Sequence, residues 1–303
     1  MSGEIKILKR EHPDSLGASR RVGTVLTVRN STRQSRLSRV RWLMIMMGLV
    51  MVGWPSAFGQ DLPAQEIMRR EYFVSRVKDS KSEATMTLIN AAGQQRVRRM
   101  VSLTKLQDNG VSQMRLARFL YPPDVKGTAT LMIEHTERDD DMWVYVPALG
   151  KVRRLVSKNK SDSYVGTDFS YGDIIGHKVE DYSHRLIGLE IVEGMECFVV
   201  ESMPVSDRVR REGGYGKRIS WVRKDNFVSP KLEGYDLHGR LFKRLLTTDI
   251  RLVDPTLGRW QPMRMEMINL ETGHGTILSY DDFKANAGVQ QTIFTTRYLE
   301  KEP

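Results

Sequence analysis

The residue types best suited to chemistry in this chain stand together in the run DDDMWVYVPALGKVRRL, residues 139–155. Its three carboxylates, Asp139, Asp140 and Asp141, offer the oxygen ligands that calcium prefers, but the flanking residues lack the alternating oxygen ligands of a known calcium loop. The acids are followed by an amphipathic segment, a Pro-Ala-Leu-Gly reversal and a basic segment. This order predicts a solvated acidic turn and a β-hairpin rather than a metal site.

Other signatures of catalysis or cofactor binding are missing from the sequence. The six histidines are scattered, no H-E-x-x-H motif pairs two of them on a helix, and no G-x-S-x-G motif marks a serine hydrolase. The run GGYGKR, residues 213–218, lacks the leading glycine of a phosphate-binding loop and predicts a flexible hairpin tip. We therefore expect no catalytic residue, no metal site, no cofactor and no enzymatic activity. Two carboxylates that meet only in space would leave an envelope hydrolase as an alternative.

The basic charge of the chain is concentrated near its N-terminus. The chain carries 47 Lys and Arg against 37 Asp and Glu, a net charge of +10. Residues 1–59 hold ten basic and three acidic residues, which leaves 37 and 34 for residues 60–303. Since the remainder is nearly balanced, it lacks the basic excess that binds nucleic acid, and we expect no nucleic-acid partner.

The N-terminal region has the pattern of an export signal. An uncharged run, residues 42–54, is followed by small residues and preceded by Arg33, Arg36, Arg39 and Arg41. At thirteen residues, this run is short for a helix that crosses about 30 Å of hydrocarbon. We predict an upstream extension and a signal peptide over residues 1–59, cleavage before Gln60, and a single periplasmic domain over residues 60–303. An uncleaved membrane anchor is the alternative.

The remaining sequence predicts a mainly β (α+β) fold. The single cysteine, Cys197, excludes an intrachain disulfide. One helix is predicted over residues 61–77, with Asp61 as its N-cap. Beyond it, apolar and polar residues alternate between recurring turn signals, which predicts about ten to twelve strands in one antiparallel sheet. Because a sheet of this size must bury one face or curl, we expect a curled sheet, closed by short helices, that encloses a cavity.

The strongest basic patch follows the amphipathic segment and consists of Lys151, Arg153, Arg154, Lys158 and Lys160. Two interpretations remain open. The patch is either a solvated edge strand that resists aggregation or a surface for anionic lipid or a membrane partner.

Several longer phrases together resemble one known family. They are FLYPPDVKGTATLMIEH (119–135), DDDMWVYVPALGKVRRL (139–155), GTDFSYGDI (166–174), WVRKDNFVSPKLEGYDLHGRLFKRL (221–245) and FTTRYLE (294–300). In this order they resemble the outer-membrane lipoprotein-sorting protein family, relatives of the LolA and LolB carriers, over about residues 64–300. One departure is Gly172, where the family usually has an acidic residue.

The resemblance implies a half-open antiparallel β-barrel of about eleven strands, capped by short helices, in the periplasm. Its apolar concave face would shield the acyl chains of a lipid or lipoprotein during transfer between inner-membrane machinery and the outer membrane. The family often accompanies RND-type transporters, so an accessory subunit without its own cargo is the alternative. The carrier is expected to act as a monomer.

Alternation within the strands predicts which residues line such a cavity. We expect the wall at Met86, Leu88, Phe119, Leu131 and Ile133, with aromatic residues Trp143 and Tyr145 at the rim and Phe169 and Tyr171 on a short helical lid. Alternation alone does not say which face of each strand is concave, and an ordinary packed core is the alternative.

Overall fold

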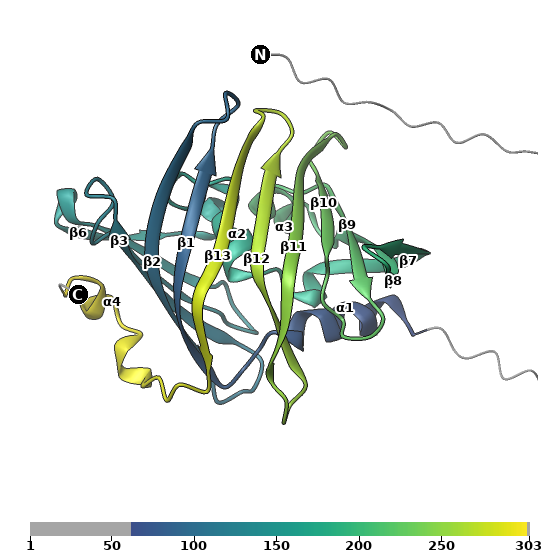
Figure 1. Ribbon diagram of the computed structural model, residues 1–303, viewed down its shortest axis with the longest axis horizontal. Coiled ribbons are helices and arrows are strands. Elements are labelled where there is room, and N and C mark those ends of the chain that lie inside the picture. The colour runs from purple at the N-terminus through teal and green to yellow at the C-terminus, as the bar shows by residue number, and fades with distance from the viewer. Residues whose placement is uncertain (1–61, 302–303) are drawn as a thin grey trace, which may run out of the picture. The chain divides into compact units, whose positions relative to one another are not determined.

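A computed structural model describes residues 62–301 of the chain (Figure 1). The predicted signal peptide, its cleavage site before Gln60 and the predicted N-cap Asp61 lie outside the described residues. Within residues 62–301, no helix is both long and apolar enough to span a membrane.

The described residues form one curled antiparallel sheet of thirteen strands, with the spatial order β6-β5-β4-β3-β2-β1-β13-β12-β11-β10-β9-β8-β7. In Figure 1 the central strands face the viewer, and both ends of the sheet turn back behind them. The sheet does not close, because β6 and β7 are its two free edges. The strands are β1 (Asp79–Ile89), β2 (Gln95–Leu106), β3 (Gln113–Tyr121), β4 (Ala129–Ile133), β5 (Asp141–Val146), β6 (Lys151–Leu155), β7 (Tyr182–Val192), β8 (Met195–Pro204), β9 (Lys217–Arg223), β10 (Lys231–Tyr235), β11 (Leu241–Asp254), β12 (Arg259–Asn269) and β13 (His274–Ala285).

The predicted mainly β fold with a half-open barrel is confirmed, although the sheet has thirteen strands rather than about eleven. The strand that sequence reasoning missed is β7. Its alternation is broken where the register with β8 shifts between Leu186 and Gly188, and it pairs on one side only. An edge strand with a bulge carries a weak period-two signal, because neither face is uniformly buried.

Four α-helices and five single 3₁₀ turns complete the described fold: α1 (Ala64–Val74), α2 (Tyr171–Ile175), α3 (Asp207–Gly213), α4 (Thr296–Leu299), η1 (Pro147–Leu149), η2 (Ser157–Ser161), η3 (Tyr164–Gly166), η4 (Val179–Asp181) and η5 (Gln291–Ile293). Helix α1 lies within the predicted segment, but it begins after Pro63, whose fixed φ suits a helix start. Its buried residues Ile67 and Met68 pack with Val200 and Val222 of the sheet.

A buried ion pair fixes the residues that follow α1. The guanidinium of Arg76 donates to Glu134 at 2.7 Å, and both side chains are about 5% exposed. The same carboxylate also accepts from the backbone N–H of Gln113 at 3.0 Å. Because the charges are paired and hydrogen-bonded, their burial is tolerated, and the helix is held at one end of β3 and β4.

The two faces of strands β3 to β5 belong to different clusters. The inner-face cluster, on the concave side, is built around Met86, Met100, Phe119, Met132 and Met142. The outer-face cluster contains Met114, Leu116, Ala129 and Leu131, and it is covered by Val289, Phe294 and Leu299 of the C-terminal segment. Arg118 secures this cover by donating to the backbone carbonyls of Tyr298 at 2.9 Å and Leu299 at 3.2 Å.

Candidate functional site

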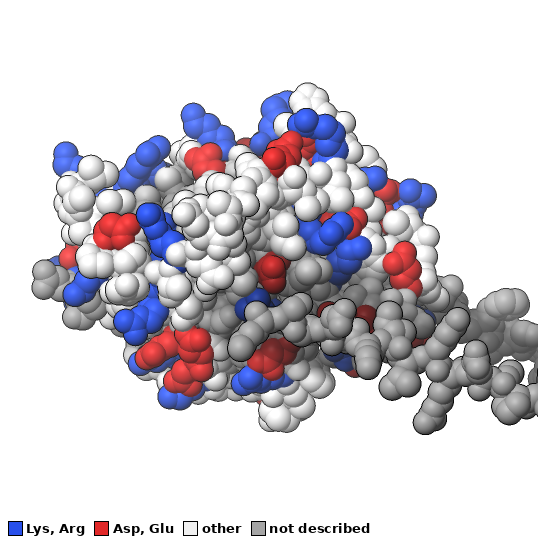
Figure 2. Space-filling view, turned by 45° about the horizontal axis from the view of Figure 1, so that its top comes forward, with Lys and Arg blue, Asp and Glu red and all other residues white. Residues whose placement is uncertain are grey.

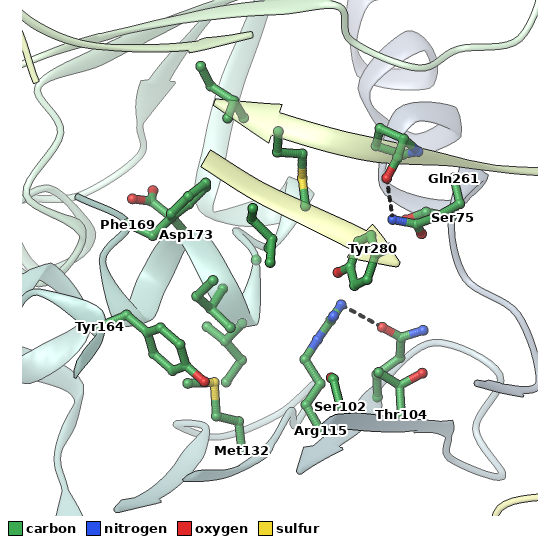
Figure 3. Close-up of a pocket in the computed structure, with 18 of the residues that line it drawn as sticks. Ser75, Ser102, Thr104, Arg115, Met132, Tyr164, Phe169, Asp173, Gln261 and Tyr280 are labelled. Carbon is green, nitrogen blue, oxygen red and sulfur yellow. Dashed lines mark hydrogen bonds between the residues drawn. The ribbon is translucent and has the colours of Figure 1, made fainter. Parts of the chain in front are cut away.

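A central cavity of about 320 Å³ lies within the curl of the sheet, bordered by α1, by α2 and by the inner faces of nine strands. Figure 3 shows Arg115, Ser102 and Thr104 on one side of it and Tyr164, Phe169 and Met132 on the other, where Asp173 of α2 also lies. The cavity therefore has a polar part and an apolar part.

Methionine dominates the apolar part of the cavity. Five methionines from four strands line it: Met86, Met100, Met132, Met265 and Met267. Phe169, Ile174 and Ile175 face them from α2 and the residue pair before it. Because methionine side chains are unbranched and polarisable, they adapt to apolar guests of different shapes.

The polar part follows from the register of β1, β2 and β3. One level across these strands places Ser80, Thr104 and Arg115 side by side, and Ser80 Oγ lies 2.7 Å from Thr104 Oγ1. The next level holds Ser82, Ser102 and Ala117. The third level is apolar, with Ala84, Met100 and Phe119. Each of the three inner faces thus changes from polar to apolar along the strand.

Charges around the cavity are unevenly compensated. The carboxylates of Glu134 and Asp173 lie within ion-pair distance of Arg76 and Lys243, respectively. Among the described residues, the guanidinium groups of Arg115 and Arg218 form no ion pair with a carboxylate. Glu71 also lines the cavity, and burial raises the pKa of its carboxyl, an effect that the charge of Arg218 opposes.

Helix α2 is fastened over the cavity by Asp173. Its carboxylate accepts from the Ser170 backbone N–H at 2.8 Å and from the Tyr215 hydroxyl at 2.8 Å, and it lies 3.3 Å from Lys243 Nζ. Burial alone would raise the pKa of this carboxyl, but Lys243 and the hydrogen bonds hold it well below its usual range. Through these contacts, α2 is held to Lys243 of β11 and to Tyr215 in the loop before β9.

Two neighbours of Asp173 complete this lid. His177 Nδ1 lies 3.1 Å from the Tyr182 hydroxyl, and burial followed by the charge of Arg218 lowers the pKa of His177 to about 4. At Gly172, an added Cβ would stand 3.1 Å from the backbone carbonyl of Lys160, so an acidic side chain is tightly restricted there. In this chain the acidic group of the lid is that of Asp173, one position later.

The run GGYGKR is not the flexible hairpin tip that the sequence predicts. Tyr215 within it is 2% exposed and donates to Asp173, while Arg218 lies over the ring of Tyr182 at 4.7 Å. In the sequence, the large aromatic residue Tyr215 is the feature that could have indicated burial of this run. Glycine-rich turns at the surface seldom contain such a residue.

Some of the residues predicted to line the cavity lie on the inner face of the sheet, and others do not. Met86 and Phe169 line the central cavity, and Phe119 and Tyr171 belong to the same inner-face cluster. Leu88 packs at the margin of that cluster. Tyr171 lies in α2, and Phe169 precedes it by two residues, as the predicted short lid requires.

The other predicted wall residues and the two predicted rim residues lie on the opposite face, which corrects their placement. Leu131, Ile133, Trp143 and Tyr145 belong to the outer-face cluster beneath the C-terminal segment. Their strand neighbours Thr130, Met132, Met142 and Val144 take the inner face. The predicted alternation is present, but the choice of concave face is inverted in β4 and β5, because the two faces of a strand are equivalent by periodicity.

Two of the three acids in the turn are buried, contrary to the sequence-based expectation of a solvated turn, and only Asp139 is exposed. Asp140 lies 2.6 Å from Lys160 Nζ with its side chain 2% exposed, and Asp141 accepts from Arg138 and Arg154 at 2.7 Å each. Burial would raise the pKa of Asp141, but hydrogen bonds from Arg138, His135 and Arg154 lower it to about 2. The acids are therefore the anchor of the hairpin.

Some residues of the basic patch form ion pairs with these acids, and the others do not. Arg154 and Lys160 are engaged by these acids, whereas Lys151, Arg153 and Lys158 are exposed. Strand β6 is an edge of the sheet, as one of the two interpretations requires. On the molecular face in Figure 2, basic and acidic side chains are interspersed.

A second, more open pocket of about 710 Å³ adjoins the central cavity. The two share Tyr72, Gly176 and His177 as lining residues, so the junction lies between α1 and the end of α2. The lining of this pocket comes mainly from residues 134–139, residues 176–182 and α3. Across residues 62–301, no group of three or more His, Cys, Asp or Glu side chains is arranged to hold a metal ion.

Comparisons with known proteins identify relatives of the chain. A family model described only as an uncharacterized protein family matches residues 111–301. A search of curated proteins found no match. A solved structure of a LolA superfamily protein from Nitrosomonas europaea is 24% identical, with a TM-score of 0.61 over 78% of this chain and 99% of that one, which supports the shared fold.

Two solved structures are more similar. A domain provisionally named as an outer membrane lipoprotein-sorting protein, from Vibrio parahaemolyticus, is 30% identical with a TM-score of 0.72 over 78% of this chain and 98% of that one. A DUF1329 family protein from Desulfovibrio piger is 30% identical with a TM-score of 0.72 over 78% of this chain and 97% of that one. Because this identity extends over nearly the whole of both relatives, the chain belongs to the outer membrane lipoprotein-sorting protein family, which includes DUF1329 proteins.

Proposed function

We propose that this protein is a periplasmic carrier that shelters acyl chains of a lipid or lipoprotein during transfer between inner-membrane machinery and the outer membrane. The observation that carries the proposal is the methionine-lined cavity enclosed by a half-open barrel and the α2 lid. The relatives named for lipoprotein sorting and the export pattern of the N-terminal sequence support the same role.

The physical basis is burial of apolar surface without covalent chemistry. Each methylene group that leaves water contributes about 0.8 kcal/mol, so one acyl chain supplies useful affinity. The carboxylates of Glu134 and Asp173 are engaged in holding elements together: Glu134 with Arg76 fixes α1, and Asp173 with Lys243 fixes α2. These contacts favour a carrier over an envelope hydrolase.

The test compares an inner-face variant with a matched outer-face variant. Met265 lines the cavity and Trp143 packs in the outer-face cluster, and both are partly buried. Native mass spectrometry of protein from a periplasmic fraction should show bound lipid in the wild type and in Trp143→Glu, and none in Met265→Glu. Circular dichroism checks that both variants remain folded. A folded wild-type protein that is always empty would contradict the carrier function.

Docking to an envelope protein is a second candidate function, favoured by the free edge strand β7. Its apolar residues Leu189 and Ile191 are 55% and 73% exposed. An exposed apolar edge strand is uncommon in a protein without a partner, since such edges invite pairing with other chains. We propose that an inner-membrane transporter of the RND type pairs with this edge.

Site-specific disruption tests that docking. Ile191→Glu should abolish co-purification with an RND-type transporter, because a charge on β7 opposes burial of the edge. Leu149→Glu is the matched control, since Leu149 is 68% exposed and lies next to β6 at the other edge. Equal co-purification of both variants would exclude β7 as the docking edge.

A further inference from the structure

The chemistry of the cavity specifies the class of molecule that it holds. Along β1, β2 and β3 the inner face changes, level by level, from hydroxyl and guanidinium groups to methionine and phenylalanine. A purely apolar guest would leave the polar levels facing hydrocarbon, at a cost for each polar group that loses water without gaining a partner. An amphiphile with its head at Arg115 and its chain toward Met86 matches both parts.

Buried polar atoms without a hydrogen-bond partner are concentrated around the cavity. Across the described residues, seven buried side-chain nitrogen and oxygen atoms have no hydrogen-bond partner, and four of these belong to lining residues of the cavity: Arg115, His177, Arg218 and Ser220. Ser220 is 1% exposed and Arg218 is 9% exposed. Buried polar groups nearly always have partners, so this concentration indicates a site for a polar ligand group.

Arg115 is the best placed of the four to bind a head group. Its guanidinium donates to the Gln113 side chain at 2.7 Å, while its Nε has no partner. It lies next to Thr104 in the register, and Figure 3 shows it directed toward Tyr280 across the polar part. A guanidinium without a carboxylate favours an anionic group, since its fork of donors matches a carboxylate or phosphate.

The remaining charge of the cavity agrees with an anionic guest. Glu134 and Asp173 are paired with Arg76 and Lys243. Glu71 is opposed by Arg218, and burial shifts this carboxyl toward its neutral form. Among the described residues, Arg115 and Arg218 therefore line the cavity without a carboxylate in ion-pair contact.

We propose that the cavity binds a single-chain amphiphile with an acidic head, a carboxylate or a phosphate, that is held by Arg115. This inference rests on the proposed carrier function and names its ligand class. The cavity volume of about 320 Å³ stands at the lower end of the range of roughly 300–1,000 Å³ for small-molecule sites. It therefore suits one chain better than several.

Fluorescence displacement of a neutral apolar probe from the purified full-length chain tests the ligand class. The ligands are dodecanoate, dodecyl phosphate and dodecanol, which share one chain length and differ in the head. The wild type should bind at least one of the acids about tenfold or more tightly than the alcohol, as a charge-assisted hydrogen bond allows. The tighter of the two acids identifies a carboxylate or a phosphate as the natural head.

Variants assign the preference to one side chain. Arg115→Met should abolish the preference for acids while dodecanol still binds, which also shows that the variant is folded. Arg115→Lys should keep most of the preference, because the charge remains. Arg153→Met on the exposed edge strand is the matched control and should behave as the wild type does.

The outcomes separate this inference from the carrier function. Equal binding of dodecanol and both acids by the wild type, or an unchanged preference in Arg115→Met, would overturn the anionic head and leave the carrier function in place. Binding of none of the three ligands would contradict both.

Discussion

The two faces of strands β3 to β5 both carry large apolar residues, but they differ in what covers them. The outer face is apolar in adjoining strands, with Leu116, Leu131 and Trp143 together, and the chain itself covers it with residues 289–299. The inner face interrupts its apolar residues with Arg115 and Thr130, and a cavity remains there. The more apolar outer face is closed by the protein's own segment, to which its one buried arginine in β3, Arg118, donates. The inner face, with its polar side chains, leaves room for a guest that carries polar groups.

The largest expected effect comes from truncating a fully buried residue on each face. Phe119 of the inner face is 0% exposed and Leu131 of the outer face is 1% exposed. Replacing either with alanine should lower the free energy of unfolding by about 2–5 kcal/mol, measured by chemical denaturation. Only Phe119→Ala should change the affinity for an apolar ligand, because Phe119 belongs to the cluster that borders the cavity. An altered affinity in Leu131→Ala would show that the outer face takes part in binding.

A smaller effect on the free energy of unfolding is expected from the protonation of His177, next to the α2 lid. Burial lowers the pKa of His177 to about 4 in the folded protein, from its ordinary value of 6.5. Between these values the unfolded chain binds a proton that the folded chain does not. Stability should therefore fall as the pH decreases from about 6.5 to about 4, by at most about 1.4 kcal/mol per pH unit.

Denaturation curves at several pH values check this contribution. His177→Gln should flatten the dependence in that window, since the group that titrates is gone. The control is His238→Gln, because His238 is exposed in the turn between β10 and β11 and should leave the slope unchanged. An equal slope in wild type and His177→Gln would contradict a buried neutral histidine beneath the lid.

The smallest effect on stability is expected at the exposed members of the basic patch, Lys151, Arg153 and Lys158. Replacing all three with glutamine should change the free energy of unfolding by only about 0.5 kcal/mol, because they lie in solvent. If the patch contacts anionic lipid, affinity for anionic vesicles should fall by about 1 kcal/mol for each charge removed.

A second triple variant at Lys78, Lys81 and Lys126 has the same loss of charge at exposed positions elsewhere. Vesicle co-sedimentation that is reduced equally in both triple variants would indicate a general charge effect. In that case the solvated-edge interpretation of β6 would be favoured.

Sequence reasoning located the elements of the site better than their contacts. The segments of β1 to β6 and the lid around Phe169 and Tyr171 were identified from alternation and from family phrases. The buried cluster of Asp173, Tyr215 and Lys243 was missed, because its members come from α2, from the loop before β9 and from β11. Because the curl of the sheet brings these residues together from distant parts of the sequence, no spacing between neighbouring residues predicts their contact.

The sequence by itself determined the mainly β fold, the alternation of each strand and the family, because these depend on local periodicity and on phrases that the chain carries directly. Only the tertiary structure decided which face is concave. A period of two produces two equivalent faces, and the choice depends on a cover from far along the chain. That cover is held by the contact between Arg118 and Leu299, which stand 181 residues apart. The outer face is thereby filled, and Arg115 with the methionines is left to line the space within.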